Sequence, residues 1–251
     1  MDIDERDRVA QQFGVAIEQV ERDHLISYLL AFLSVQFGDR IHFIGGTALA
    51  RTHLPDGRLS EDIDLVAIDI RKAVAVQLDD ALPRAIARTH GRLTVEPLFS
   101  AVADTVPVTV TTVEGMAVKI QLLSSRDRIV WPAERRLLDQ RYSDAPTAEL
   151  IVPTLPAFAA SKTATWADRR APRDLWDLWA LSEIGAIDET ALKLFKKFGP
   201  TSRAPSGHLF EHPPSDAAWR TQLAGQTRLT VTAANALRTV RNAWAHVVGD
   251  K

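Results

Sequence analysis

A glycine pair that follows a predicted strand is the first feature of this chain whose residue types and spacing suit chemistry. Residues 41–44 form a short, mostly apolar run, and Gly45, Gly46 and Thr47 come directly after it. This order is typical of a strand, a tight turn and the first turn of a helix. The first amides of a helix have no intrahelical acceptor and lie at the positive end of the helix dipole. The turn therefore indicates a phosphate-binding site.

Two aspartates alternate with apolar residues a little further along, in the order Asp62-Ile63-Asp64-Leu65. On a strand, a period of two places both aspartates on one face and the apolar side chains on the other. Neighbouring carboxylates repel each other, and a bound Mg²⁺ removes that repulsion because it prefers oxygen ligands. We therefore predict Mg²⁺ at Asp62 and Asp64. A phosphate-binding turn joined to metal-binding carboxylates indicates nucleotide chemistry.

The composition is that of an ordinary globular protein. The chain has 251 residues, of which 46% are hydrophobic and 25% charged, enough for one large or two small domains. There is no cysteine, which excludes disulfides and cysteine–zinc sites. The N-terminus is charged, and no apolar run is long enough to span a membrane, so we expect a cytoplasmic protein without membrane contact.

The net charge of −2 argues against a protein that binds nucleic acid through charge alone. Its distribution is uneven, because residues 151–251 carry 13 basic and 9 acidic side chains, a net charge of +4. This half has a mild preference for a polyanion, and the acidic half carries the predicted metal site.

Hydrophobic periodicity predicts an α+β chain with two domains, at residues 1–125 and 126–251. In the first domain we expect helices over 5–37, 46–53 and 70–89, the last of them kinked or split at Pro83, and strands over 41–44, 62–68, 93–98, 106–113 and 116–123. Glu114 and Gly115 are predicted to form a turn between the last two strands. In the second domain we expect a connection over 126–150 with a short helical piece, a helix over 155–170, a helix with Pro172 in its first turn, a loop over 199–215 and helices to the end.

Three charged residues of the second half have ordinary structural interpretations, and Lys162 has a functional one as well. Lys162 lies in a helix of small and apolar residues, where a lone lysine usually extends to solvent, although beside a phosphate site it would neutralise a triphosphate. Asp174 lies in the first turn of its helix, where a carboxylate stabilises the helix dipole. Asp177 is a suitable partner for Arg170 or Arg173.

A cluster of arginines lies at the same helix junction. It contains Arg169, Arg170 and Arg173. Such a cluster is usually a solvated corner, and near an active site it binds phosphates instead.

Four separated blocks of the sequence resemble the AbiEii/AbiGii-type toxin family, which includes the MenT toxins. The blocks are Gly45-Gly46-Thr47-Ala48-Leu49, then Arg58 with Ser60 and Asp62-Ile63-Asp64-Leu65, then Lys162, then Arg173-Asp174 with Asp177-Leu178. Members are nucleotidyltransferase toxins of bacterial toxin–antitoxin and phage-defence systems. The resemblance covers about residues 40–185, and its specificity comes from four blocks in the same order.

The resemblance implies a polymerase-β-like nucleotidyltransferase core, a small mixed sheet with helices, followed by a helical C-terminal half. It implies Mg²⁺-dependent transfer of a nucleotide from an NTP with release of pyrophosphate. In the MenT branch the acceptor is the 3′ end of tRNA, so translation is inhibited. It also implies a cognate antitoxin protein as partner.

The resemblance assigns roles to individual residues. Activity should depend on Ser60, Asp62, Lys162 and Asp174. Mg²⁺ is assigned to Asp62 and Asp64, and the nucleotide to Gly45, Gly46, Thr47 and Arg58. Asp174 either orients Lys162 or contacts the acceptor. We predict that replacing Asp62 or Lys162 by alanine abolishes growth inhibition and leaves the protein folded.

Several alternatives stay open. The acceptor is tRNA, or it is a protein hydroxyl or a small molecule, and a third hypothesis is an inactive module that binds a partner. Related folds often carry a third carboxylate on a later central strand, whereas residues 116–123 offer Lys119 and Gln121 but no acid. The number of metal ions, one or two, therefore stays open as well.

Overall fold

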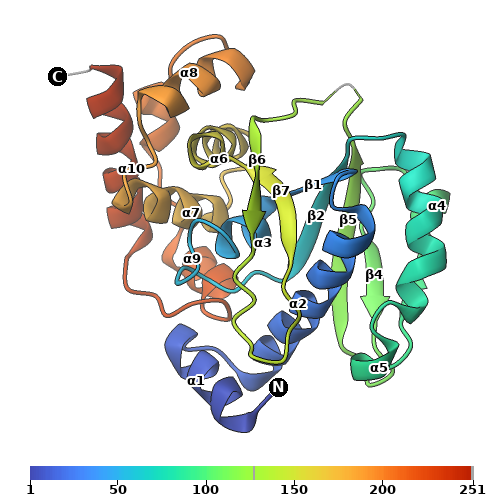
Figure 1. Cartoon of the computed structure of the whole chain (residues 1–251). Helices are drawn as coiled ribbons and strands as arrows, with labels where there is room; N and C mark the ends of the chain where they lie inside the picture. The colour runs from blue at the N-terminus through green and yellow to red at the C-terminus, as the bar shows by residue number, and fades with distance from the viewer. Residues whose placement is uncertain (127, 250–251) are drawn as a thin grey trace. The chain divides into compact units, whose positions relative to one another are not determined.

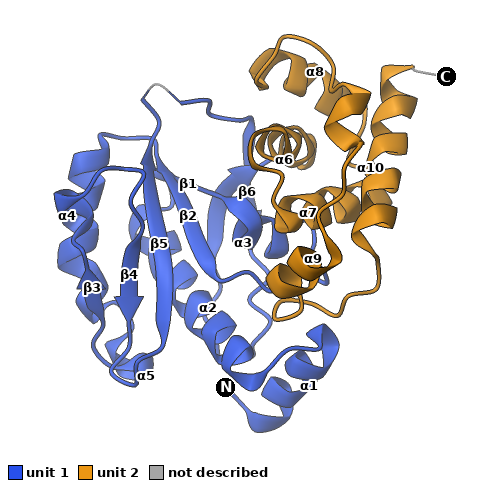
Figure 2. Ribbon diagram, turned by 180° about the vertical axis from the view of Figure 1, so that it is seen from behind, with its two compact units in different colours: residues 1–153 blue, residues 154–251 orange. Residues whose placement is uncertain are grey.

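Two compact units make up the computed structural model, Met1–Pro153 and Thr154–Lys251, and the structure describes residues 1–126 and 128–249 (Figures 1 and 2). The sequence places the domain boundary at 125/126, whereas the units divide at 153/154. The reason is that two strands after residue 126 complete the sheet of the first unit.

The first unit is built on one mixed sheet. Its seven strands follow the order β3-β4-β5-β2-β1-β7-β6. They are β1 Ile41–Ile44, β2 Asp62–Ala67, β3 Thr94–Glu96, β4 Val108–Thr111, β5 Ala117–Ser124, β6 Ala133–Leu137 and β7 Glu149–Pro153. The α-helices are α1 Ile3–Phe13, α2 Ile17–Phe37, α3 Gly45–Ala50, α4 Arg71–Ala81 and α5 Ala87–His90. The five predicted strands are confirmed with ends that differ by two residues or fewer, and the turn at Gly115 is confirmed as well.

Strand β2 is central because β1 pairs with it antiparallel on one side and β5 parallel on the other. Its burial alternates as the sequence predicts: Ile63 and Leu65 are fully buried, while Asp62 and Asp64 are half-buried on the opposite face. Helices α2 and α4 both contact β5 (Figure 1). The apolar face of the sheet therefore forms the core, and both aspartates lie on the other face.

Two predicted helices are divided where the sequence carries a break. The region 5–37 forms α1 and α2, because Gly14 ends α1 with a left-handed φ of 67°. The region 70–89 forms α4, a 3₁₀ turn over Leu82–Arg84 and the short α5. Pro83 lies inside that 3₁₀ turn, so the predicted split at this proline is confirmed.

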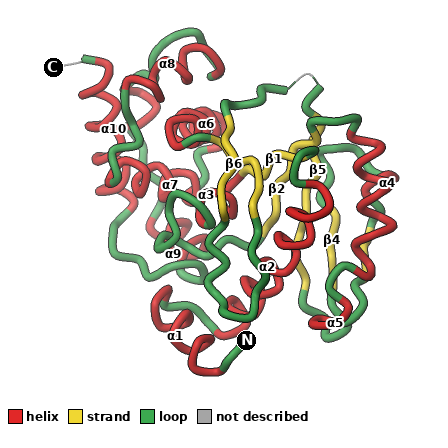
Figure 3. Tube along the Cα trace, viewed as in Figure 1, coloured by secondary structure: helices red, strands yellow, loops and turns green. Residues whose placement is uncertain are grey.

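The segment 126–150 was predicted wrongly. In place of a short helical piece, its described residues contain β6 and the start of β7, which appear as two adjacent strands in Figure 3. Strand β7 pairs parallel with β1, and β6 pairs antiparallel with β7 at the sheet edge. An edge strand with Glu134, Arg135 and Arg136 has no apolar alternation, so its pairing with β7 identifies it and its sequence pattern does not.

The second unit is helical. It contains α6 Leu155–Arg169, α7 Pro172–Glu183, α8 Glu189–Phe198, α9 Asp216–Leu223 and α10 Ala233–Val248. Pro172 is confirmed in the first turn of α7, where its missing N–H costs no hydrogen bond. The predicted loop 199–215 holds one 3₁₀ turn, and there the Leu209 carbonyl accepts a 2.8 Å hydrogen bond from the indole of buried Trp166. In the described part of the chain, no helix has the length and apolarity needed to span a membrane.

Candidate active site

The glycine turn lies against the carboxylates of β2. Ile44, the last residue of β1, is in register with Asp64, so the chain leaves β1 beside that aspartate. Gly45 follows with φ +80°, and a Cβ at this position would overlap the Asp64 carboxylate. Both the backbone conformation and the space therefore require glycine at residue 45.

The next glycine is equally crowded, by two polar side chains. A Cβ at Gly46 would lie 2.5 Å from Nη2 of Arg58 and 3.1 Å from Oγ of Ser60. Arg58 and Ser60 are both buried, although they belong to the loop between α3 and β2. The guanidinium and the hydroxyl thus lie on the backbone at the start of α3, where the unpaired helical amides are.

Thr47 fastens α3 to β2. Its buried hydroxyl donates a hydrogen bond to the backbone carbonyl of Asp62. Because a hydroxyl has one proton to donate, this bond assigns the Thr47 side chain to positioning the turn. A contact between residue 47 and a phosphate is left to its backbone amide.

Asp62 and Asp64 have the donor chemistry that suits a hard divalent cation. No described residue forms a hydrogen bond or ion pair with the Asp62 carboxylate, although Asp62 is half-buried on a central strand. Within the described ranges there is no group of three or more His, Cys, Asp or Glu side chains that would hold a metal. Two carboxylates fit Mg²⁺, which usually takes one or two from the protein and completes its shell with water and phosphate.

The strand register shows which residues lie where related folds often carry a third carboxylate. On β5, Lys119 is in register with Asp62, and Gln121 with Asp64. Glu96 lies on β3, separated from β5 by the whole of β4, and Glu114 lies in the turn before β5. The parallel neighbour of the aspartates therefore offers a cation and an amide in place of an acid.

A buried arginine that the sequence interpretation missed fixes the far end of α3. Arg51 is fully buried and pairs with Asp23 of α2 at 2.8 Å. It also donates to the backbone carbonyls of Asp23 and Asp139, at 2.8 and 2.9 Å. Burial lowers the pKa of Arg51 to about 10, and the charge of Asp23 opposes that change. An aspartate inside the apolar α2 was the sequence signal for such a partner.

In the second unit, Lys162 of α6 is buried between two carboxylates of α7. Its Nζ lies 2.6 Å from Oδ2 of Asp177 and 3.4 Å from Oδ1 of Asp174. The exposed fractions are 7% for Lys162, 0% for Asp174 and 2% for Asp177. The interpretation of Lys162 as a lysine that extends to solvent is therefore wrong.

Arg169 completes this group. Its Nε and Nη2 donate to the two carboxylate oxygens of Asp174, at 2.6 and 2.9 Å, and its own side chain is 58% exposed. Asp174 is thus held in place by a bidentate arginine and lies next to Lys162. The group, which with Asp177 carries two positive and two negative charges, is electrically balanced. Arg170 lies instead over the Trp166 ring, 5.6 Å from its centre.

The predicted site residues therefore fall into two groups, one in each unit. Seven lie together in the first unit: Gly45, Gly46, Thr47, Arg58, Ser60, Asp62 and Asp64. The other two, Lys162 and Asp174, lie together in the second unit with Asp177.

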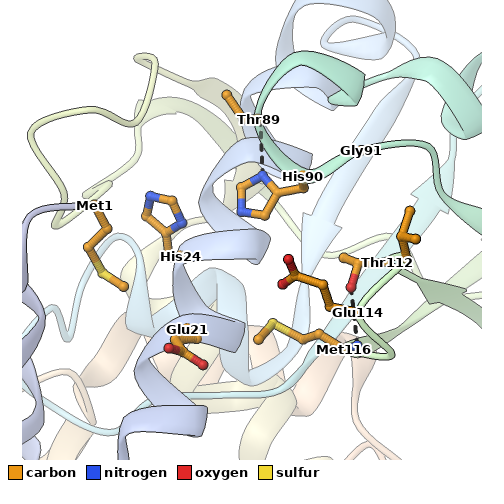
Figure 4. Close-up of a pocket in the computed structure, with 10 residues that line it drawn as sticks. Met1, Glu21, His24, Thr89, His90, Gly91, Thr112, Glu114 and Met116 are labelled. Carbon is orange, nitrogen blue, oxygen red and sulfur yellow. Dashed lines mark hydrogen bonds between the residues drawn. The ribbon is translucent and has the colours of Figure 1, made fainter.

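A separate cavity of about 390 Å³ lies elsewhere in the first unit, and none of the predicted site residues lines it (Figure 4). His24 and His90 lie side by side in it, with ring centres 5.2 Å apart. Burial, with a smaller contribution from His24, lowers the pKa of His90 to about 4. Both rings are therefore uncharged at neutral pH, since burial lowers the pKa of His24 as well.

Among solved structures, the chain is similar to MenT4, a nucleotidyltransferase toxin from Mycobacterium tuberculosis. The TM-score is 0.68 and the identity 24%, over 98% of this chain and 90% of MenT4, which confirms the predicted fold class. A nucleotidyltransferase-like protein from Paracoccidioides brasiliensis is more distant, with 15% identity over 65% of this chain and 77% of that protein and a TM-score of 0.45. No curated protein matches the sequence.

The order of the elements, the glycine turn and the two aspartates agree with one family. Residues 27–245 match the family model described as the nucleotidyl transferase AbiEii toxin of type IV toxin–antitoxin systems, so this chain is a nucleotidyltransferase and belongs to the AbiEii toxin family.

Proposed function

We propose that the chain transfers a nucleotide from an NTP to the 3′ end of tRNA and thereby inhibits translation. The observation that carries the proposal is the meeting of the glycine turn, Arg58 and Ser60 with the two aspartates of β2. In the reaction, the terminal hydroxyl oxygen of the acceptor bonds to the α-phosphorus, and the bond from that phosphorus to the β-phosphate oxygen breaks. Pyrophosphate leaves, and the hydroxyl proton passes to water.

The residues of the first unit bind and orient the triphosphate. The amides at the start of α3, the Arg58 guanidinium and the Ser60 hydroxyl donate to its oxygens. Asp62 and Asp64 would hold Mg²⁺, and the bound ion would supply positive charge to the phosphates. Thr47 keeps the turn against β2, so these donors have fixed positions before the substrate arrives.

In the second unit, Lys162 supplies a cation whose position is fixed. Asp177 and Asp174 hold its Nζ, and Arg169 holds Asp174. We propose that activity requires this group, in which Asp174 and Asp177 orient the Lys162 ammonium. Because its two positive and two negative charges cancel, the group holds the ammonium in a fixed orientation without adding net charge.

Because toxins of this family act with an antitoxin, we also propose a cognate antitoxin protein as partner. The tRNA acceptor rests on the resemblance of the four sequence blocks to the MenT branch and on the mild positive charge of residues 151–251. A protein or small-molecule acceptor is the alternative.

The acceptor is tested with tRNA whose terminal ribose diol has been opened by periodate. We expect the wild-type protein, with Mg²⁺ and α-³²P-labelled NTP, to label intact tRNA and not the oxidised form. Equal labelling of both forms would show that the 3′ end is not the acceptor. A labelled protein band with unlabelled tRNA would show that the acceptor is a protein hydroxyl and not tRNA. Asp62→Asn is the negative control in each arm.

A further inference from the structure

A row of polar residues crosses the sheet face that carries the aspartates. From β2 outward, Asp62 is in register with Lys119, Lys119 with Thr109, and Thr109 with Glu96. The residues that flank Lys119 on β5, Val118 and Ile120, are buried on the opposite face. This part of the face, on β2, β5 and β4, has no helix of the first unit over it in Figure 2.

Lys119 is exposed, and no described residue forms a hydrogen bond or an ion pair with it. Its strand runs parallel to β2, and neighbouring strands lie about 4.8 Å apart. A flexible four-carbon stem lets its ammonium reach a phosphate held at Asp62 without moving the backbone. No hydrogen bond or ion pair among residues 1–126 and 128–249 accounts for a cation at this register position.

We propose that Lys119 binds the triphosphate held at Asp62 and Asp64 and supplies the positive charge that a second metal ion would otherwise supply. The site then binds one divalent ion per chain. Two observations support this: the residue beside Asp62 on β5 is a lysine and not an acid, and the only carboxylate further along the row, Glu96, lies two strands beyond it. The proposal rests on the proposed nucleotidyltransferase site in the first unit.

Metal stoichiometry and nucleotide affinity test the proposal without turnover. Mn²⁺ binding is counted by electron paramagnetic resonance in the complex of the full chain with an NTP analogue whose α,β bridge is a methylene group. We expect one Mn²⁺ per wild-type complex. Lys119→Gln should weaken binding of the analogue about tenfold, the loss expected for one charged hydrogen bond. Its melting temperature should not change, because no described residue pairs with Lys119.

The matched control is Lys72→Gln, which removes an exposed lysine of α4, and we expect no effect on binding. Two Mn²⁺ per wild-type complex would overturn the proposal, and so would unchanged affinity in Lys119→Gln. If Asp62→Asn abolishes analogue binding while Lys119→Gln leaves it unchanged, the inference about Lys119 fails and the proposed site stands. If the wild-type protein binds neither Mn²⁺ nor the analogue, both fail together.

Discussion

At the scale of single residues, Asp62 is unusual. Its carboxylate is half-buried on a central strand, and no described residue pairs with it. Catalysis explains this better than stability does, because carboxylates that serve stability are paired or fully solvated. Arg51 shows the contrast. It is buried, donates to three groups and holds the end of α3, so its contacts account for it as a structural residue.

We predict that Asp62→Asn lowers nucleotidyl transfer about a thousandfold, because loss of metal-based charge stabilisation costs several kcal/mol in the transition state. The free energy of unfolding should change by less than about 0.5 kcal/mol, since no contact is broken. Transfer rates and denaturant unfolding of the two proteins measure both quantities. A stable Asp62→Asn variant with full activity would show that the reaction does not require the Asp62 carboxylate.

The Lys162 group needs a different design, because its members are buried. Removal of Lys162 alone takes the ammonium away from the buried Asp177 and Asp174, and breaking a buried ion pair costs about 3–5 kcal/mol. Arg169 still pairs with Asp174 in that variant. The sequence-based expectation that Lys162→Ala leaves the protein folded therefore needs a stability control. We predict that Lys162→Met lowers the unfolding free energy by about that amount and abolishes transfer.

The control for Lys162→Met is the double variant with Asp177→Asn, which removes the negative charge that lies 2.6 Å from Nζ of Lys162. We expect it to recover part of the stability and none of the activity. Recovery of activity together with stability would show that Lys162 serves the fold and not the reaction.

At the scale of elements, the β1–α3 turn explains why seven of the predicted site residues lie together. They lie within one strand–turn–helix–loop–strand unit, so the register of β1 on β2 alone brings them together. The pairing of Arg169 with Asp174 was not predictable in this way. It depends on the short junction between α6 and α7, where Arg170 adopts a left-handed φ of 52°.

The glycine turn gives a matched pair of substitutions. Gly45 and Gly115 both have positive φ, of 80° and 88°, so alanine at either position should cost about 1–2 kcal/mol of backbone strain. A Cβ at Gly45 overlaps the Asp64 carboxylate, whereas nothing lies within 4 Å of a Cβ at Gly115. We predict that Gly45→Ala loses most of its transfer activity and that Gly115→Ala keeps it, at similar melting temperatures. Equal activities would show that the close approach of Gly45 to Asp64 has no role.

At the scale of the whole molecule, the α+β class and the helical C-terminal half were predictable, and the full sheet was not. Strands β6 and β7 join the sheet through pairing of β7 with β1, more than one hundred positions earlier in the chain. Local periodicity carries no information on such pairing. The charged residues of β6 also lack the apolar alternation by which a strand is predicted. The boundary between the two units depends on the same long-range pairing.

Global stability should depend on pH through the histidine cavity. The pKa of His90 falls from 6.5 to about 4 in the folded protein, so between those values the unfolded chain takes up a proton that the folded protein does not. Stability is therefore lost as the pH falls through this window. We predict that His90→Gln shows a smaller fall in melting temperature between pH 7 and pH 4 than the wild type.

His24 and Asp144, which pair with each other next to this cavity, have lowered pKa values in both proteins and contribute to the slope that remains. The control is His212→Gln, at an exposed histidine of the second unit, and it should keep the wild-type slope. An unchanged slope in His90→Gln would contradict the burial-induced shift.

We propose that the aspartates and the glycine turn of the first unit catalyse nucleotidyl transfer, and one assay tests this directly. The most direct measurement incubates the purified full chain with Mg²⁺, total tRNA and each α-³²P-labelled NTP in turn, and resolves the products on a denaturing gel. We predict a labelled tRNA band with the wild-type protein and no labelled band with the Asp62→Asn variant. The two proteins should have the same melting temperature, which shows that the variant is folded. No labelled product from folded wild-type protein with any of the four NTPs, or equal labelling by Asp62→Asn, would contradict it.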